Sequence, residues 1–488
     1  MKKQAFNPYL PLSEYIPDVE PYVFDGRLYI YGSHDLAGGE KYCPGDYMSW
    51  SAPIDDLGNW TCHGVSYRKT QDPTNKEGKK ELWAPDVAKG NDGKYYIYYC
   101  LAFVPEIGVA VSDTPTGPFE FYGHIKYPEN ILAGKELNEH FPFDPGVLVD
   151  DNGKVYLYYG FSPAFELTPP SPESFEEKGE EAPDFSKIVF SEGAMVVELE
   201  SDMLTMKDEP KLMVPGGKIS EGTGFEGHAF FEASSMRKVN AKYYFVYSSQ
   251  LSHELCYATS DSPDKGFTFG GTIISNGDIG FKGNEKPVNM MGNNHGSIIK
   301  INEEWFIFYH RHTHGTESSR QGCAEKIQIL PDGSIPQVEI TSCGLNGGPL
   351  LGNGVYSSAI ACYLTGNTDM SKIVYGNSLK EVQPYIFEED EELHYIANIG
   401  DEVKIGYKYF DIKEVSKMTL NIRGKAEGKI TVILDSIDGE SVGEAEVSLS
   451  SEEWIQTDIS VKISKGIHAI YFSYYGKGSF QFKEFILQ

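Results

Sequence analysis

One sequence pattern recurs five times within the first 310 residues, and it limits the folds that this chain can adopt. An Asp or Asn turn residue is followed by an alternating strand rich in aromatic residues, a combination typical of β-hairpins. The five copies are DGRLYIY from Asp25, DGKYYIYY from Asp92, NGKVYLYY from Asn152, NAKYYFVY from Asn240 and NEEWFIFY from Asn302. Their starts are 67, 60, 88 and 62 residues apart, so each copy marks one unit of an internal repeat.

Repeated all-β units of this size predict a β-propeller, in which four-stranded blades surround a central axis. Helical periodicity is weak throughout this region, and five units predict five blades. A series of unrelated hairpins is the alternative, and five matches disfavour it. The longest interval contains a Pro- and Glu-rich stretch, residues 162–185, which we interpret as a solvated insertion.

The sequence changes character after residue 345. Residues 344–354 are rich in glycine, and no further copy of the repeat follows them. Residues 375–488 contain short alternating segments, from VKIGYKYFDI to SFQFKEFIL, which predict a β-sandwich of the jelly-roll type. We therefore predict an all-β chain with a five-bladed propeller over residues 1–345, a connecting segment over 346–374 and a β-sandwich over 375–488.

The charge of the chain restricts its partners. The formal net charge is −29 at pH 7, which disfavours nucleic acid and anionic membranes as partners and favours a neutral ligand.

No stretch of about 18 apolar residues is present that would cross a membrane, and the first residues lack the apolar part of a secretory signal. The seven cysteines are scattered without a CxxC pair, which is typical of reduced thiols. We therefore expect a cytoplasmic protein.

Three acidic residues precede repeat strands at corresponding places. Asp18 lies before the first copy, Asp144 before the third and Glu232 before the fourth, each seven or eight residues before the turn. The strand that precedes the outer hairpin of a blade is the innermost one, so we expect these side chains to converge on the axis. An Asp before Pro is by itself more often a turn residue. Glu20 and Glu226 are the alternatives to Asp18 and Glu232.

Together these motifs resemble glycoside hydrolase family 43, whose members are five-bladed β-propeller enzymes that act on arabinose- and xylose-containing polysaccharides and oligosaccharides. The resemblance covers roughly residues 7–340. It rests on the aspartate before VFDGRLYIYGSHD, on ELWAPDV, on FDPGVLVDDNGKVYLYYG, on FFEAS before RKVNAKYYFVYSS, and on NNHGSIIK before EEWFIFYHRH, in this order.

The resemblance implies an inverting hydrolase in which Asp18 is the general base, Glu232 is the general acid, and Asp144 orients the acid and tunes its pKa. Inversion requires two carboxyl groups about 6.5–9.5 Å apart, with room for a water molecule. The acid must hold its proton near neutral pH, so apolar surroundings or a nearby like charge must raise its pKa. The family often has Pro directly after the general base, whereas in this chain Val19 and Glu20 stand between Asp18 and Pro21.

The resemblance also implies further site residues. His34 is expected to line the pocket, and Arg320 resembles an arginine of the last blade that hydrogen-bonds the sugar. Trp83 is a candidate for stacking on a sugar, although core packing explains it equally well, and Asp86 is expected to be a structural partner nearby. His295 matches a histidine on the propeller axis beside a calcium ion held mostly by water, an ion with a structural or electrostatic role. No phosphate-binding or dinucleotide-binding loop is present, so we expect no organic cofactor.

Residues 375–488 resemble family 6 carbohydrate-binding modules, through YIANIGDEVKIGYKYFDI, KITVILDSIDGESVG and KGIHAIYFSYYGKGSFQFKEFIL. Such modules hold sugar between aromatic side chains in loops at one end. Tyr474, Tyr475 and Phe480 are candidates for this role, whereas Trp454 is expected to pack against the domain. A purely structural domain that packs on the propeller is an equally compatible interpretation.

The leading hypothesis is an exo-acting α-L-arabinofuranosidase that removes arabinose from xylan or arabinan fragments. A β-xylosidase with the same catalytic residues is the nearest alternative, because pocket loops decide between the two sugars. A non-catalytic sugar-binding propeller is a third possibility, which the three intact acids disfavour.

Overall fold

The computed structural model describes residues 3–133, 140–164, 189–367 and 383–488, and the insertion predicted at 162–185 lies mostly outside them. Its described regular structure consists of β-strands and single-turn 3₁₀ helices, so the predicted all-β class is confirmed. The 3₁₀ helices are η1 (Lys69–Gln71), η2 (Pro128–Asn130), η4 (Gly217–Ile219), η5 (Phe281–Gly283), η6 (Gly344–Asn346) and η7 (Ser358–Ile360). None of the described helices is long and apolar enough to cross a membrane.

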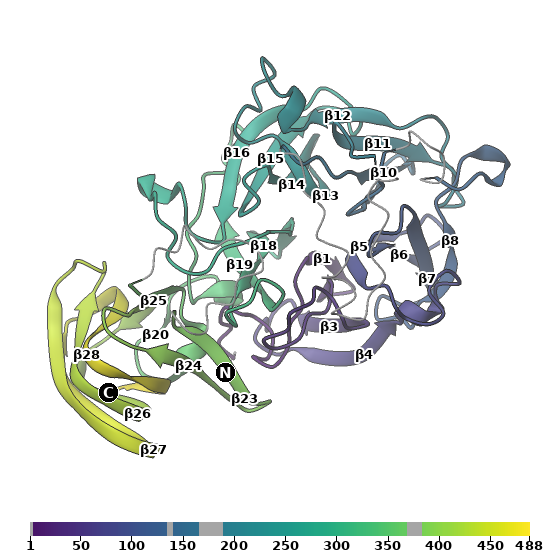
Figure 1. Cartoon of the computed structure of the whole chain (residues 1–488). Helices are drawn as coiled ribbons and strands as arrows, with labels where there is room; N and C mark the ends of the chain where they lie inside the picture. Colours follow the sequence, from purple (N-terminus) through teal and green to yellow (C-terminus); the bar gives the residue numbers. More distant parts are fainter. Residues whose placement is uncertain (1–2, 134–139, 165–188, 368–382) are drawn as a thin grey trace.

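Five antiparallel sheets surround an axis and form the predicted five-bladed propeller (Figure 1). Blade one contains β1 (Glu20–Phe24), β2 (Arg27–Tyr31), β3 (Tyr47–Pro53) and β4 (Thr61–Tyr67). Blade two contains β5 (Leu82–Lys89), β6 (Tyr95–Leu101), β7 (Ile107–Ser112) and β8 (Glu120–His124). Blade three contains β9 (Gly146–Val149), β10 (Val155–Tyr159), β11 (Gly193–Leu199) and β12 (Lys211–Pro215). Blade four contains β13 (Phe230–Val239), β14 (Lys242–Ser249), β15 (Glu254–Ser260) and β16 (Thr268–Ser275), and blade five contains β17 (Ile298–Ile301), β18 (Glu304–His312) and β19 (Arg320–Ile327).

Each copy of the sequence repeat forms the hairpin between the first and second strands of a blade, as predicted. In the first copy, Asp25 and Gly26 have φ angles of 48° and 75°. A two-residue turn with left-handed backbone at both positions matches the twist of the two strands that it joins. The aromatic second strands β2, β6, β10, β14 and β18 are therefore equivalent elements of successive blades.

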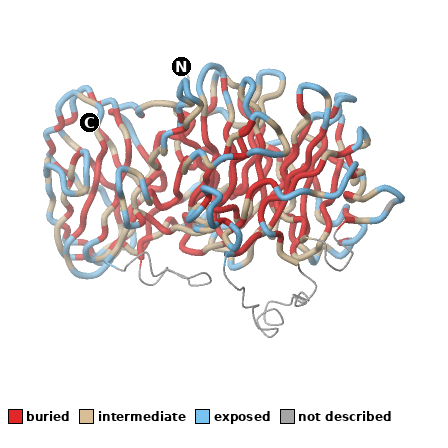
Figure 2. Tube along the Cα trace, turned by 90° about the horizontal axis from the view of Figure 1, so that it is seen from above, coloured by how far each residue is buried: buried red, intermediate tan, exposed pale blue. Residues whose placement is uncertain are grey.

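The first strands of the blades lie around the axis, and the space between neighbouring blades is filled with apolar side chains. Strand β1 contacts β5 and β17, and β9 contacts β5 and β13. Five clusters of buried residues each join two adjacent blades; for example, Tyr98 of blade two packs in one cluster with Leu157 of blade three. Figure 2 shows this buried interior within a shell of exposed loops. The packing between blades fixes how the inner ends of the strands face one another.

The N-terminal segment closes the propeller along β19, the last of the three strands of blade five. Asn7 donates through Nδ2 to the Ala324 carbonyl at 2.9 Å, and the Ala324 N–H donates back to Asn7 Oδ1 at 2.9 Å. The Tyr9 N–H donates to the Gly322 carbonyl at 3.3 Å. Joining the two ends of the repeat array in this way covers the exposed strand edge and fixes the ring.

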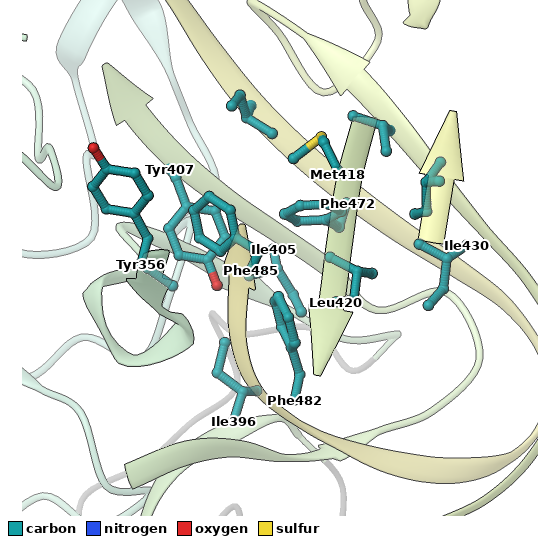
Figure 3. Packing of buried hydrophobic residues seen from close by; sticks show 14 of the residues in the cluster. Tyr356, Ile396, Ile405, Tyr407, Met418, Leu420, Ile430, Phe472, Phe482 and Phe485 are labelled. Carbon is teal, nitrogen blue, oxygen red and sulfur yellow. The ribbon is translucent and has the colours of Figure 1, made fainter. Parts of the chain in front are cut away.

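The C-terminal domain is one nine-stranded hydrogen-bonded sheet that curves around a core of buried aliphatic and aromatic residues (Figures 1 and 3). Its strands are β20 (Leu350–Leu351), β21 (Gly354–Ser357), β22 (Tyr363–Thr365), β23 (Tyr385–Asp390), β24 (Leu393–Ile399), β25 (Lys404–Ile412), β26 (Val415–Leu434), β27 (Ser441–Ile463) and β28 (Gly466–Leu487).

Two features of this domain differ from the sequence-based expectation. The segment 346–374, expected only to connect the domains, supplies β20, β21 and β22, which pair with β25 and β28. The short strands expected separately between residues 415 and 488 merge into three long ones. A register shift next to Gly424, whose φ angle is 137°, lets β26 bend without ending the ladder. The domain is therefore built from fewer and longer strands than expected, and these strands curve around its core.

Candidate active site

Asp18 lies two residues before the innermost strand of blade one, in a strained and buried position. Its φ angle is 56°, a left-handed conformation that costs about 1–3 kcal/mol for a non-glycine residue. Its Oδ1 accepts a hydrogen bond from Arg320 Nη1 at 2.9 Å, and its backbone N–H donates to His310 Nδ1 at 3.3 Å. Burial by itself would raise the pKa of Asp18, but the Arg320 guanidinium, together with His310 and His295, outweighs it and the pKa falls to about 2. Asp18 is therefore a carboxylate at neutral pH.

Arg320 is held almost entirely by the protein. Its Nε and Nη2 donate to the two carboxylate oxygens of Asp35 at 2.8 and 3.1 Å, while Nη1 donates to Asp18. The side chain is 2% exposed. The Arg320 guanidinium thus lies between the carboxylates of Asp18 and Asp35. Its hydrogen bonds orient Asp18, and its charge favours the ionised form of Asp18. The predicted contact of Arg320 with sugar stays a prediction.

Glu232 and Asp144 come from neighbouring blades and meet at a distortion in β13. The pairing register of β13 shifts on both sides of Glu232, and Ala233 has a φ angle of 66°. Such bulges re-aim a side chain out of the regular alternation. The Ala233 N–H donates to Asp144 Oδ2 at 3.1 Å, which ties the acid-bearing strand to the segment before β9.

The three acids differ in their proton affinity. Burial and the negative charge of Asp18 raise the pKa of Glu232 to about 8, although Arg320 opposes the shift. Burial, with Glu232 and Asp18 nearby, raises the pKa of Asp144 well above its usual range. One site thus combines the ionised carboxylate of Asp18 with the protonated carboxyl group of Glu232, which is the pairing that general base and general acid catalysis requires.

A row of half-buried aromatic rings runs beside the acids. Trp83 of β5 packs edge to face with Phe143, Phe143 lies 5.0 Å from Phe161, and Phe161 lies 5.0 Å from Phe231, measured between ring centroids. Phe143 and Phe231 immediately precede Asp144 and Glu232 in the sequence. Apolar surroundings favour a protonated acid, and aromatic rings offer flat surface to a sugar ring. The stacking role of Trp83 stays a prediction.

His34 is engaged by its own surroundings. Its Nε2 lies 3.0 Å from Glu14 Oε1, and its Nδ1 lies 3.1 Å from the Asp46 carbonyl oxygen. Burial lowers the pKa of His34, but Glu14, together with the Asp46 carbonyl and the Asp35 charge, outweighs this effect and the net shift is upward. Both ring nitrogens therefore face acceptors of the protein, and a direct role of His34 in sugar binding stays a prediction.

The two alternative acids occupy other environments. Glu20 is paired with the buried Arg237 guanidinium and accepts from Ser235 Oγ at 3.0 Å, so its carboxylate is committed to an ion pair. Glu226 is exposed in a loop and accepts from the Thr223 N–H at 3.1 Å. These contacts favour Asp18 and Glu232 as the reacting pair.

Asp86 links blades, in line with the expected structural role. It accepts from the Tyr22 hydroxyl of blade one at 2.6 Å and from the Val147 N–H of blade three at 2.7 Å. Since β5 carries Asp86 itself, one buried carboxylate connects three blades near the axis.

His295 lies between two of these carboxyl groups without direct hydrogen bonds to them. Its Nδ1 is 3.6 Å from Asp144 Oδ2, and its Nε2 is 3.8 Å from Glu20 Oε1, which is buried and has no hydrogen-bond partner among the described residues. Burial lowers the pKa of His295 to about 4, so the ring is neutral. Spacings this long suit bridging water, and the unpartnered Glu20 oxygen could accept from such a water. Burial raises the pKa of Glu20 to about 8, although Arg237 opposes the shift. These residues fit a cation held mostly through water.

The described residues contain one group of His, Cys, Asp and Glu side chains close enough to hold a metal ion directly, and it lies elsewhere: His228, Glu254 and Cys256. Glu254 already accepts from His228 Nδ1 and Ser249 Oγ, both at 2.6 Å, and from Thr272 Oγ1 at 2.9 Å. Burial raises the pKa of the Cys256 thiol well above its usual value, so the sulfur keeps its proton. We interpret this group as a hydrogen-bonded structural cluster.

Two important residues were not identified from the sequence. His310 contacts the backbone of Asp18, and Asp35 clamps Arg320. His310 lies in the segment EEWFIFYHRH, and Asp35 lies at the end of VFDGRLYIYGSHD. Neither motif indicates that its residue has a partner some 300 residues away in the sequence.

The aromatic candidates of the C-terminal domain divide into core and surface residues. Tyr474 and Phe480 are buried within the domain core, so their expected place in an exposed cleft is wrong. Tyr475 is 49% exposed. Trp454 packs edge to face against Tyr395, with ring centroids 5.3 Å apart, in line with its expected packing role.

Comparisons with known proteins point to one family. Residues 14–335 match the family model for glycosyl hydrolases family 43. The whole chain is 48% identical to a xylosidase/arabinosidase of Thermoclostridium stercorarium, covering 99% of that protein. It is 26% identical to an arabinoxylan arabinofuranohydrolase of Paenibacillus polymyxa, over 96% of this chain and 72% of that one. A solved family 43 β-xylosidase/α-arabinofuranosidase from a compost microbial metagenome, in complex with xylotriose, matches 69% of this chain and 98% of its own with 29% identity and a TM-score of 0.51. The chain therefore belongs to glycosyl hydrolases family 43.

Proposed function

We propose that this glycoside hydrolase is an inverting, exo-acting α-L-arabinofuranosidase that releases arabinose from arabinoxylan or arabinan oligosaccharides. The observation that carries the proposal is the pairing of an ionised Asp18 with a protonated Glu232 in one buried, aromatic-lined site. A single-displacement hydrolysis needs both forms at the same pH.

In the proposed reaction, the Asp18 carboxylate accepts a proton from a water molecule while the water oxygen bonds to the anomeric carbon. The bond from that carbon to the leaving oxygen breaks, and Glu232 donates its proton to this oxygen. Asp18 ends protonated and Glu232 ionised, and exchange with solvent restores both. Asp144 holds the strand of Glu232 through Ala233, and Arg320 keeps Asp18 ionised and oriented.

The names of the relatives support an arabinose- or xylose-containing substrate. The relative that spans the whole chain is called a xylosidase/arabinosidase, and another is called an arabinoxylan arabinofuranohydrolase. A β-xylosidase is the second candidate, favoured by the first of these names and by the activity given for the solved enzyme that holds xylotriose. A shared catalytic pair serves either sugar, since the pocket walls select the substrate.

We also propose one structural calcium ion, held mostly through water beside His295. Glu20 Oε1 and Asp144 Oδ2 lie beside the ring nitrogens of His295 and would accept hydrogen bonds from its water shell. A bound divalent cation would stabilise the ionised forms of these carboxyl groups. The cytoplasmic location and sugar binding by the C-terminal domain stay predictions.

The test uses the purified full chain with nitrophenyl α-L-arabinofuranoside, nitrophenyl β-D-xyloside and the matching natural oligosaccharides. We expect the larger kcat/KM on the arabinofuranoside, and proton NMR should show the inverted anomer of the sugar forming first. A larger value on the xyloside would select the second candidate. Release of the retained anomer, or turnover of neither sugar, would refute the proposed mechanism.

A further inference from the structure

The C-terminal domain reaches the segment that carries Asp18 through one buried tyrosine. Tyr15 lies three residues before Asp18, and its hydroxyl donates to Oε2 of Glu388 in β23 at 2.5 Å. The same hydroxyl oxygen lies 2.8 Å from Nε2 of His314, whose ring packs edge to face on the Tyr15 ring. Glu388 belongs to the C-terminal sheet, whereas Tyr15 and His314 belong to the propeller.

This contact continues as a chain of hydrogen bonds into the last blade. His314 Nδ1 lies 2.7 Å from Thr313 Oγ1, and Thr313 Oγ1 donates to Gln321 Oε1 at 2.8 Å. Gln321 Nε2 then donates to the Leu12 carbonyl at 2.8 Å, which returns the chain to the N-terminal segment. Gln321 directly follows Arg320 in β19. This circuit of hydrogen bonds therefore connects the segment that precedes Asp18 with the segment 313–321, which contains Arg320.

The hydroxyl protons give the circuit a direction. Thr313 donates its hydroxyl proton to Gln321, and Tyr15 donates its hydroxyl proton to Glu388. Each ring nitrogen of His314 lies within hydrogen-bond distance of one of these two hydroxyl oxygens. Removing the Glu388 carboxylate would take away the acceptor of the Tyr15 proton and break the circuit at its origin.

Backbone contacts transmit the same constraint. The Asp35 N–H donates to the Tyr15 carbonyl at 2.9 Å, and Asp35 is the residue that clamps Arg320. The Ile386 N–H of β23 donates to the Thr313 carbonyl at 3.1 Å. Asp35, which clamps Arg320, is therefore bonded directly to the backbone of Tyr15, whose side chain makes the contact with Glu388.

We propose that Glu388 and Tyr15 are positioning residues for the reaction, so that the C-terminal domain holds the general base in its productive geometry. The proposal rests on the proposed role of Asp18. A base that is misplaced by about 1 Å costs on the order of 10²-fold in rate. Loss of the contact should therefore lower kcat, whereas sugar binding, and with it KM, should change little.

The chain offers a matched control at the same domain interface. The Tyr409 hydroxyl of the C-terminal domain donates to Glu339 Oε1 of the preceding segment at 2.5 Å, the same pair of groups at the same distance. No described contact of Tyr409 leads to Asp18. Tyr15→Phe and Tyr409→Phe therefore remove equivalent bonds that differ in their connection to the site.

The experiment compares kcat, KM and melting temperature for the wild type, Tyr15→Phe, Glu388→Leu, Glu388→Gln and Tyr409→Phe in the full chain. We expect about a 10-fold or greater fall in kcat for Tyr15→Phe and Glu388→Leu, with KM within about 2-fold of the wild-type value. Glu388→Gln keeps an acceptor oxygen for Tyr15 and should restore most of kcat. If Tyr409→Phe lowers kcat as much as Tyr15→Phe at equal loss of melting temperature, the proposal is wrong.

Amide hydrogen exchange tests the same idea without turnover, so it separates this proposal from the proposed function. Glu388→Leu should increase exchange in residues 12–18 and 313–320 relative to Tyr409→Phe. Unchanged exchange in both segments would overturn the proposal even if the wild type is an active hydrolase. An inactive wild type in which these segments still loosen would overturn the proposed function and retain the positioning contact.

Discussion

Replacing Glu232 with Gln is the sharpest test of the catalytic pair, because it keeps the shape of the side chain and removes its proton. With a pKa of about 8, Glu232 is protonated at pH 6 in a ratio of about 100 to 1, from 10 to the power 8 − 6. A carboxyl group with a pKa of 4.5, the ordinary value for glutamate, would be protonated at pH 6 in only about 3% of molecules. The site therefore raises the population of the reactive form by about 30-fold.

The size of the expected loss depends on the leaving group. General acid catalysis contributes about 10²–10⁴-fold, or about 2.7–5.4 kcal/mol of the barrier. Glu232→Gln should lose this factor on natural oligosaccharides, whose leaving alcohols need a proton. It should lose far less on dinitrophenyl glycosides, whose leaving group departs as a stable anion.

The assay is kcat/KM against pH on both kinds of substrate, with Glu226→Gln as the matched control in an exposed loop. Wild-type activity on oligosaccharides should fall as the pH rises through about 8, because only protonated Glu232 donates. Burial also penalises the carboxylate form, so the wild type loses stability between about pH 4.5 and 8, and the variant should melt no lower than the wild type above that range. The assignment of Glu232 as the general acid would be refuted if Glu232→Gln lowered kcat/KM equally on both substrates. It would also be refuted if kcat/KM of this variant still fell as the pH rises through about 8.

Further predictions concern the other groups of the site and the second domain. Asp18→Asn should lower kcat by about 10²–10⁴-fold whatever the leaving group; steady-state rates near the wild-type value would contradict its role as base. Glu20→Gln leaves the buried Arg237 charge without its carboxylate and should cost about 3–5 kcal/mol in a denaturant melt; lost turnover at unchanged stability would instead make Glu20 the base. Chelator treatment should lower the melting temperature or kcat if a cation lies beside His295, and constancy of both would exclude it. Phe480→Ala should cost about 3–5 kcal/mol of unfolding free energy, measured by the same melt, because the ring lies in the C-terminal core.

The repeated hairpins illustrate which parts of the fold were predictable. Each depends on a local turn followed by a period-2 pattern, and both are properties of adjacent residues. Counting back from those turns also placed Asp18, Asp144 and Glu232 at the inner ends of their blades, since strand register fixes that position. The C-terminal strands were harder, because a bulge next to Gly424 looks in sequence like the end of a strand, whereas the hydrogen-bonded ladder continues through it.

Local sequence patterns were enough to predict the five blades, the three acids at their inner ends and the family to which the chain belongs. They did not reveal that Asp35 and Asp18 share Arg320, that Glu20 pairs with Arg237, or that Glu388 of the second domain contacts Tyr15. These contacts set the chemistry of the site because proton affinity depends on charges and burial within a few ångströms in space. Those neighbours come from different blades and from the other domain, and no local pattern in the sequence records them.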